Sequence, residues 1–282
     1  MQTRFNPEFL GTARGQEADR ILRACVHCGF CTATCPSFLL TGNELDSPRG
    51  RIYLIQAALA GATVSRVTQT HLDRCLSCQS CETACPSGVR YHRLLDLGRE
   101  AVERQVGRTL LAACRRFLLR KLLTTGWLFA CAVWLGRLFR PLLPAALKKM
   151  LPVRHPPGAW PAQQSRRRMV LLNGCVQNHL SPNTNAAAAR VLGRLGIQAQ
   201  IMAGEGCCGA VSFHLNAQEE GRNQARRQID RLLAQLDAGA ETIISTASGC
   251  GNFIKSYREL LADDAYYAPR AQRLVAHVKD IS

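Results

Sequence analysis

Eight cysteines in the first third of the chain form two runs with the same spacing. The first run is Cys25, Cys28, Cys31 and Cys35, the second is Cys75, Cys78, Cys81 and Cys85, and a proline follows the last cysteine of each. Two-residue gaps let one tight loop present three thiolates to a cubane cluster, which takes its fourth thiolate from elsewhere. The repeated pattern predicts two 4Fe-4S clusters and one-electron transfer.

The source of the fourth thiolate follows from the cysteine before each proline. In two-cluster ferredoxins this cysteine ligates the cluster of the other motif. The expected ligand sets are therefore Cys25, Cys28 and Cys31 with Cys85, and Cys75, Cys78 and Cys81 with Cys35. A pair of zinc sites is the alternative, but zinc closes with two ligand pairs and requires neither a third cysteine nor a cysteine-proline pair. His27 and His71 are expected to be hydrogen-bonding or packing neighbours of the motifs.

A second group of cysteines follows expected strands in the last third of the chain. Residues 169–174, 197–204 and 242–246 predict strands, and helices are expected over 185–195 and 215–236. This alternation indicates a parallel sheet, whose carboxyl edge is where ligands bind. The cysteines at that edge are Cys175, Cys207, Cys208 and Cys250. They would suit a third cluster, a metal or a redox thiol pair, and the alternative is plain burial, which free cysteine often adopts.

Helices are expected to carry the two cysteine runs of the first segment. One helix spans 16–23, a second starts at Ser47-Pro48 with serine as N-cap, and a third spans about 91–103. No alternating strand pattern occurs there. The predicted fold is thus an α-helical ferredoxin domain (1–104), a basic apolar connector (105–168) and a Rossmann-like α/β cysteine-rich domain with a parallel sheet (169–282).

The net charge of +16 is concentrated in one stretch, because no Asp or Glu occurs between Arg104 and Gly204. Within it, residues 122–136 are apolar and contain two tryptophans, but fifteen residues are short of the ~20 that a membrane span requires. An interfacial helix and a helix pair packed on the domains both fit this pattern. The charge would favour anionic lipid or an acidic partner, or form a solvated face. Nucleic acid is not expected, since no binding motif is present.

Several functional signals are missing from the sequence. There is no strand followed by GxGxxG, no P-loop and no recognisable nucleophile arrangement. The chain is therefore expected to act as a subunit that lacks its own substrate site. The start of the sequence has no apolar signal region, which favours a cytoplasmic protein.

Five stretches resemble the iron-sulfur subunit family of bacterial glycolate oxidase: RACVHCGFCTATCP, LDRCLSCQSCETACPSGVRYHRLLDLGRE, SPNTNAAAARVLGRLGI, GCCGAVSFHLNAQEEG and TASGCG. The wider group joins a helical ferredoxin module to cysteine-rich CCG domains. The resemblance implies a complex in which a flavin subunit oxidises glycolate to glyoxylate, and often D-lactate, while this subunit passes the electrons toward a quinone-linked acceptor. The basic apolar connector would hold the subunit at the inner face of the cytoplasmic membrane. The resemblance also implies that the eight ferredoxin cysteines are the cluster ligands.

The sequence departs from this family in two places. The CCG motif normally ends in Cys-x-x-Cys, whereas Phe253 stands where the second cysteine would follow Cys250. Family members usually carry a second cysteine-rich repeat, which these 282 residues lack, so a truncated, frameshifted or shortened form is expected. The alternatives are an equivalent subunit of another flavin dehydrogenase, acting on lactate or glycerol 3-phosphate, and a zinc-stabilised basic binding protein.

Overall fold

The computed structural model describes residues 3, 5–153, 155–162, 165–202 and 204–282. The chain divides into two compact units, Met1–Ala113 and Cys114–Ser282. The expected connector, 105–168, is shared between them. Three residues of its proline-rich part, Arg154, Gln163 and Gln164, lie outside the described residues, as does Ala203 in the strand expected over 197–204.

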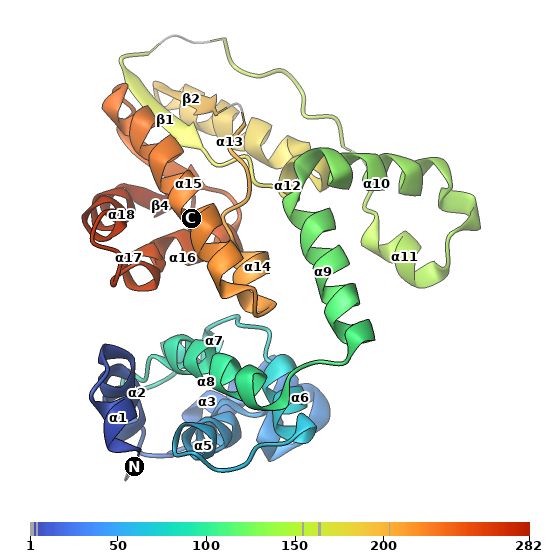
Figure 1. Ribbon diagram of the computed structural model, residues 1–282. Coiled ribbons are helices and arrows are strands. Elements are labelled where there is room, and N and C mark those ends of the chain that lie inside the picture. The colour runs from blue at the N-terminus through green and yellow to red at the C-terminus, as the bar shows by residue number, and fades with distance from the viewer. Residues whose placement is uncertain (1–2, 4, 154, 163–164, 203) are drawn as a thin grey trace. The chain divides into compact units, whose positions relative to one another are not determined.

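Every regular element among the described residues of the first unit is a helix, as the sequence predicts, and these helices are coloured blue to teal in Figure 1. Its elements are α1 (Pro7–Leu10), α2 (Ala13–Ala24), α3 (Phe30–Ala33), α4 (Pro36–Thr41), η1 (Glu44–Asp46), α5 (Pro48–Leu59), α6 (Arg66–Asp73), α7 (Ser80–Thr83) and α8 (Tyr91–Val106).

Local signals explain where the longer helices of this unit begin. Ser47 accepts a hydrogen bond from the Gly50 backbone N–H (2.9 Å), and Pro48 occupies the first position of α5, as predicted. The helix α2 starts earlier than the predicted residue 16, because Thr12 caps it by accepting from the Gly15 N–H (3.0 Å). The apolar faces of α2, α5, α6 and α8 form one core, which includes Leu22, Ile55, Leu72, Leu94 and Leu95.

The two cysteine runs are built on the same backbone pattern, repeated after fifty residues. Helices α3 and α7 cover equivalent positions, and each follows a residue in the left-handed conformation, Gly29 (φ 86°) or Gln79 (φ 59°). A second left-handed residue precedes each, His27 (φ 55°) or Ser77 (φ 53°). The two left-handed residues of each run reverse the chain direction, so the cysteines beside them can face a common point.

The second unit contains the sheet that the sequence predicts. Its elements are α10 (Gly126–Leu138), η2 (Arg140–Leu142), α11 (Ala145–Met150), β1 (Arg167–Leu171), α12 (Gln177–Leu180), α13 (Pro182–Arg194), β2 (Ile197–Ile201), α14 (Ala210–His214), α15 (Gln218–Asp237), β3 (Thr242–Ser245), α16 (Ser248–Lys255), α17 (Tyr257–Leu260), α18 (Tyr267–Ala276) and β4 (Val278–Asp280). The helix α9 (Leu110–Thr124) crosses the boundary between the units.

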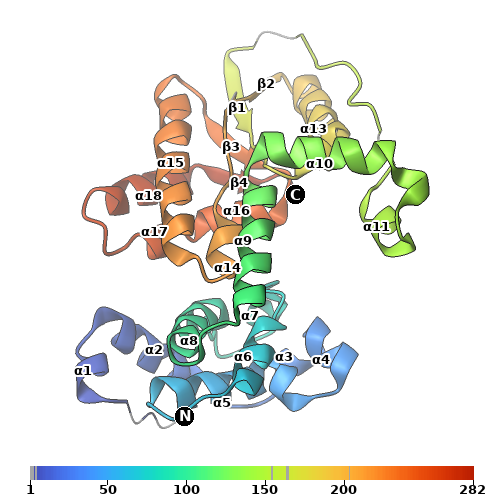
Figure 2. The same cartoon turned by 45° about the vertical axis from the view of Figure 1, so that its right-hand side comes forward.

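All four strands are parallel and follow the order β2-β1-β3-β4, with pairings such as Met169 to Ala199 and Met169 to Thr242. Successive residues of β1 face opposite sides: Val170 packs with α15 to α18, and Leu171 packs with α13. Figure 2 shows α13 on one side of the sheet and α15 and α18 on the other. The direction of winding reverses between β1 and β3, where open sheets of this type bind ligands.

The structure adds detail at three places in this unit. The helix expected over 215–236 is α15, which begins three residues later, at Gln218, after the segment Leu215–Ala217 that separates it from α14. Cys250 follows β3, as expected, and is in the first turn of α16. The strand β4 was not predicted, since three residues are too short to show a periodic pattern.

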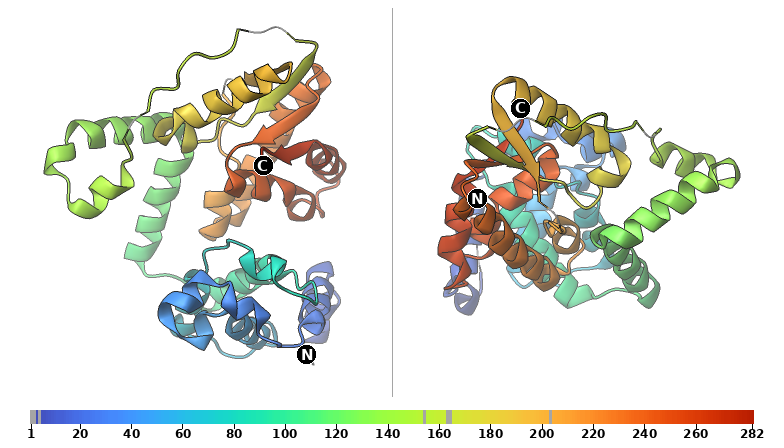
Figure 3. Two further views of the ribbon diagram at one scale, coloured as in Figure 1. Left: turned by 180° about the vertical axis from the view of Figure 1, so that it is seen from behind. Right: turned by 90° about the horizontal axis from the view of Figure 1, so that it is seen from above.

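The basic apolar stretch forms two helices joined at Thr125. Among the described residues no single helix is long and apolar enough to cross a membrane; α9 and α10 meet that criterion only as a pair and are bent by 95°. One side of α10 packs on the second unit through Phe129 and Val133, and Arg137 donates to the His179 carbonyl (3.2 Å). Figure 3 shows α10 and α11 extending away from the sheet. Trp127 and Trp134 remain 70% and 63% exposed.

The start of α5 tolerates no side chain at Gly50. A Cβ built there would lie 2.0 Å from the Glu44 carbonyl oxygen, a backbone atom that cannot turn aside. We expect Gly50→Ala to lower the free energy of unfolding by about 3 kcal/mol, which exceeds the helix-propensity gain of alanine. Gly11→Ala is the matched control, because its nearest contact would be an ordinary 3.4 Å. Urea unfolding followed by circular dichroism measures both, and equal midpoints would contradict the expectation.

Candidate functional site

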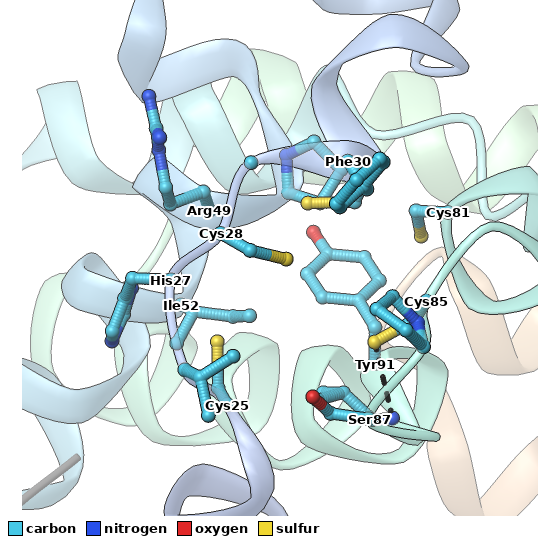
Figure 4. Close-up of a pocket in the computed structure, with 16 residues that line it drawn as sticks. Cys25, His27, Cys28, Phe30, Arg49, Ile52, Cys81, Cys85, Ser87 and Tyr91 are labelled. Atoms are coloured by element: carbon cyan, nitrogen blue, oxygen red, sulfur yellow. Dashed lines mark hydrogen bonds between the residues drawn. The ribbon is translucent and has the colours of Figure 1, made fainter.

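One cavity of the first unit gathers three cysteines of the first run and two of the second. Of these, Cys25, Cys28, Cys31 and Cys85 are called the Cys85 site below, because the fifth, Cys81, also lines the second cavity. In Figure 4 the sulfur atoms of Cys25, Cys28 and Cys85 point into the same space, and the ring of Tyr91 lies among them. The Val89 N–H donates to Cys85 Sγ (3.5 Å). Cys81 also reaches the edge of this cavity.

A second cavity gathers the complementary set. Its lining contains Cys35, Cys75, Cys78 and Cys81, called the Cys35 site below. Tyr91 lines both cavities, and its side chain is buried between them. The crossed grouping agrees with the ligand sets expected from the sequence, although the binding of a cluster by them stays a prediction.

The packing of α3 against α7 joins the two runs. Thr34 Oγ1 donates to the Ser80 carbonyl oxygen (3.2 Å), which links the residue before Cys35 to the residue before Cys81. Pro36 opens α4 and fixes the backbone at Cys35, whose N–H donates to the Thr32 carbonyl (3.2 Å). As a result, Cys35 faces the cavity of the second run.

The donor set of both cavities suits an iron-sulfur cluster. All fourteen cysteines are free thiols. Burial raises the pKa of Cys31, and the nearby Cys25, Cys85 and Cys28 raise it further; burial likewise raises that of Cys81. Thiols so placed lose their protons only when a strong positive charge compensates them, as cluster iron does. Among the described residues, no three His, Cys, Asp or Glu side chains converge as a single metal ion would require.

A buried network of charges surrounds the Cys35 site. Asp46 is fully buried, and its carboxylate lies 2.9 Å from His71 Nδ1 and 3.0 Å from Arg74 Nη1. Burial opposes ionisation, but these partners outweigh it and lower the pKa of Asp46. The sequence interpretation of His71 as a hydrogen-bonding neighbour is confirmed. His27 is also a packing neighbour, since its ring stacks on Tyr53 with 4.5 Å between centroids.

Sequence reasoning missed Asp46 and the buried Arg51, which carry this network. A signal was available for Asp46 alone, because Asp46 and Asp96 are fifty residues apart like the cysteines. The two carboxyls nonetheless differ in electrostatic environment. Burial raises the pKa of Asp96 to about 6, even though His92, Arg93 and Arg99 favour its ionised form.

The four cysteines of the second unit come together at the carboxyl edge of the sheet, as predicted. Cys175 Sγ donates to Cys207 Sγ at 3.5 Å. Hydrogen bonds from Cys175 and Cys208 lower the pKa of Cys207, and a bond from Cys208 lowers that of Cys250. The pKa values of the two donors, Cys175 and Cys208, are raised. Four sulfur atoms therefore share the site, which suits redox or soft-metal chemistry.

Two neighbours limit what this second site can bind. Burial raises the pKa of Glu205 to about 7, although its carboxylate accepts the Asn173 N–H (2.5 Å). Phe253, where the related motif has a cysteine, is buried and packs edge-on against Tyr257 (5.7 Å). The described residues thus supply four thiols at this edge, and a fifth cysteine is replaced by a packed ring.

Each of the two units matches a known domain family. The 4Fe-4S dicluster domain family matches residues 21–89, and the Cysteine-rich domain family matches residues 169–255. The glycolate oxidase iron-sulfur subunit of Escherichia coli (strain K12) is 52% identical over 97% of this chain and 68% of its own length. The chain belongs to the family of glycolate oxidase iron-sulfur subunits.

More distant relatives share the same two parts. The probable glycolate oxidase iron-sulfur subunit of Bacillus subtilis (strain 168) is 30% identical over 92% of this chain, and the chain spans 64% of that protein's length. A dihydromethanophenazine:CoB–CoM heterodisulfide reductase subunit of Methanosarcina mazei is 23% identical over 81% of the chain and 56% of its own length. No solved structure matches the chain. The resemblance stated from the sequence is confirmed, and so are the iron-sulfur character and the two-part fold.

The raised pKa of Asp96 predicts a pH-dependent stability. Because folding raises this pKa from 3.8 to about 6, the folded chain binds more protons between these values, and stability is lost as pH rises through them. We expect Asp96→Asn to remove this loss. The unfolding free energy of Asp96→Asn minus that of the native chain should increase by roughly 1 kcal/mol from pH 5 to pH 7.

Thermal unfolding of both proteins at pH 5, 6, 7 and 8 tests this expectation. The control is Asp19→Asn, at a carboxyl where burial opposes ionisation but hydrogen bonds from Thr3 and Arg23 lower the pKa. Its difference from the native chain should stay constant over this range. A pH-independent difference for Asp96→Asn would show that its carboxyl ionises normally.

Proposed function

We propose that this chain is the electron-transfer subunit of a glycolate oxidase complex, and that the Cys85 and Cys35 sites each hold one 4Fe-4S cluster. The observation that carries the proposal is the crossed grouping of eight thiols in two neighbouring cavities. When bound, the clusters supply one-electron carriers that exchange electrons without protons. The protein contributes the thiolates and keeps the two sites adjacent.

The electrons and protons of the proposed reaction balance across the partner flavin subunit, this chain and a quinone. Glycolate loses two electrons and two protons at the flavin of a partner subunit and becomes glyoxylate. The electrons then cross this chain one at a time toward a quinone, which takes two electrons and two protons. The sequence carries no dinucleotide fingerprint, so the flavin is assigned to the partner.

The partner decides which substrate is oxidised. Lactate utilization protein A of Bacillus licheniformis is 27% identical over 36% of this chain, so related cysteine-rich segments occur in proteins named for another 2-hydroxy acid. The identity of 52% to a glycolate oxidase subunit favours glycolate as the substrate of this complex. The chemistry assigned to this chain is then electron transfer alone, whichever acid the flavin oxidises.

We further propose that α9, α10 and α11 bind the anionic surface of the cytoplasmic membrane. Trp127, Trp134, Leu142 and Met150 expose their apolar side chains, and no acidic residue occurs between Arg104 and Gly204. Exposed tryptophans beside basic residues are typical of helices that lie at the lipid interface. This placement would shorten the path from the clusters to a lipid-dissolved quinone.

The ligand sets predict the metal content of the chain and of two variants. The full chain purified without oxygen should contain about eight iron and eight sulfide, which is two cubane clusters. Cys35→Ala should abolish the electron paramagnetic resonance (EPR) signal of the Cys75 run, and Cys85→Ala that of the Cys25 run, because each removes a ligand from the other run's site. Iron analysis and EPR of the reduced proteins measure both results.

Cys114→Ala is the matched control, since this cysteine is exposed and belongs to neither cavity. It should retain the full iron content. Loss of the same-run cluster in each ligand variant would refute the crossed sets. A preparation that contains zinc and no iron would refute the electron-transfer function itself.

The membrane proposal predicts a salt-sensitive association. Each basic residue near an anionic leaflet contributes about 1 kcal/mol, and this attraction is screened at high salt. We expect the chain to float with liposomes containing phosphatidylglycerol at low salt, to float less at high salt, and to remain behind with neutral liposomes. Replacing Trp127 and Trp134 by Ser should weaken flotation in both salt conditions.

The matched control for this experiment is Trp160→Ser, which removes a less exposed tryptophan from outside these three helices. It should float like the native chain. If the double tryptophan variant and the native chain behave alike on every liposome, these helices serve only as packing for the second unit.

A further inference from the structure

Arg51 is fully buried beside the Cys35 site and lines its cavity. Its Nε donates to the His71 carbonyl oxygen (2.7 Å), and its Nη1 donates to Ser37 Oγ (3.0 Å). The same Nη1 lies 4.0 Å from Cys35 Sγ. Ser37 Oγ is in turn 3.3 Å from that sulfur. A buried guanidinium and a hydroxyl therefore both face the sulfur of one expected ligand.

The positive charge of Arg51 is not neutralised by a carboxylate of its own. Arg51 Nη2 lies 3.5 Å from Asp46 Oδ1, at ion-pair distance, but has no hydrogen-bond acceptor among the described residues. The same carboxylate also binds Arg74 through Oδ2 (3.0 Å). Two guanidinium groups thus share one carboxylate, so Asp46 neutralises Arg51 only in part. The side chain of Arg74 is half exposed, and solvent screens its charge, whereas Arg51 is fully buried.

The Cys85 site has no equivalent of this arrangement. Fifty residues after Arg51, the position is occupied by Ala101. The arginine in that cavity's lining is Arg49, which is partly exposed and pairs with Glu44 (2.8 Å). Solvent screens such a pair, so its field at the thiols is weak. Arg99, which lies fifty residues after Arg49, is buried and donates to the backbone carbonyl oxygen of Cys75. Because Cys75 belongs to the Cys35 site, this is a second buried cation beside that site.

We propose that Arg51, acting with Ser37, gives the Cys35 site the higher reduction potential of the two. Reduction adds one negative charge to a cluster, and a buried cation or a hydrogen bond to a ligand sulfur favours that charge. In a medium of low dielectric this attraction is much stronger than it is in water. Arg51 is a positioning and tuning residue, and its role rests on the proposed function because it requires clusters at both sites.

An electron that enters the chain would then settle at the Cys35 site. The cluster at the Cys85 site, which has the lower reduction potential, would be the second to be reduced by a strong donor and the first to be reoxidised. The two sites are therefore not interchangeable relays, although their backbones repeat. The order depends chiefly on Arg51, since its guanidinium is the charged group that reaches a ligand sulfur of the Cys35 site.

The test is a redox titration of the full chain with its clusters, followed by EPR. We expect Arg51→Gln to move one of the two midpoint potentials to a more negative value and to leave the other in place. Arg51→Lys retains the charge and should remain near the native value. The variants Cys35→Ala and Cys85→Ala identify which signal belongs to which site.

Ser37→Ala provides a second measurement that leaves the buried charge intact. It should shift the same potential in the same direction, by less than Arg51→Gln. The matched control is Ser87→Ala, fifty residues later, whose residue lines the Cys85 cavity. It should leave the potential of the Cys35 site unchanged.

A shift confined to the Cys35 site in Arg51→Gln supports the proposal, and unchanged or equally shifted potentials overturn it. If Arg51→Gln does not fold, Ser37→Ala decides: a shift at the Cys35 site supports the proposal, and no shift overturns it. Both results require that the native chain holds about eight irons, and a chain without iron would refute the proposed function instead.

Discussion

Mutual repulsion between closely placed sulfur atoms is the constraint around which the first unit is built. Burial and neighbouring thiols raise the pKa of Cys31, so the cavity opposes the charged form that metal binding needs. Only a rigid scaffold keeps such groups together. The left-handed residues beside each run, the capped starts of α2 and α5 and the shared apolar core provide that rigidity.

The second unit meets a similar constraint in another way. Its four cysteines lie at the carboxyl edge of the sheet, where the winding reverses between the neighbouring strands β1 and β3, and Cys175 donates to Cys207. Burial raises the pKa of Glu205, beside them, to about 7. The two units thus hold cysteines for different purposes: one encloses them in cavities, the other gathers them at a sheet edge.

Much of this structure could be predicted from the sequence, because strong local signals specify it. The spacing of Cys25 to Cys35 identified the sites, Ser47-Pro48 located a helix, and alternating strand and helix segments indicated the parallel sheet. The rest depends on contacts between distant residues. The start of α15 at Gln218 and the short β4 have no periodic signature. Arg51 resembles an ordinary surface arginine of an amphipathic helix until its partner Asp46 is placed beside it.

The crossed grouping of the cysteines has a consequence for biosynthesis. The first three thiols of the Cys85 site are synthesised more than fifty residues before Cys85. With the proposed ligand sets, neither site can be completed on a nascent chain that stops short of the second run, and a scaffold protein delivering a preassembled cluster would find no full set of ligands to receive it. Under those ligand sets maturation would wait for the second run, and translation order would protect the chain from being loaded in half-finished form.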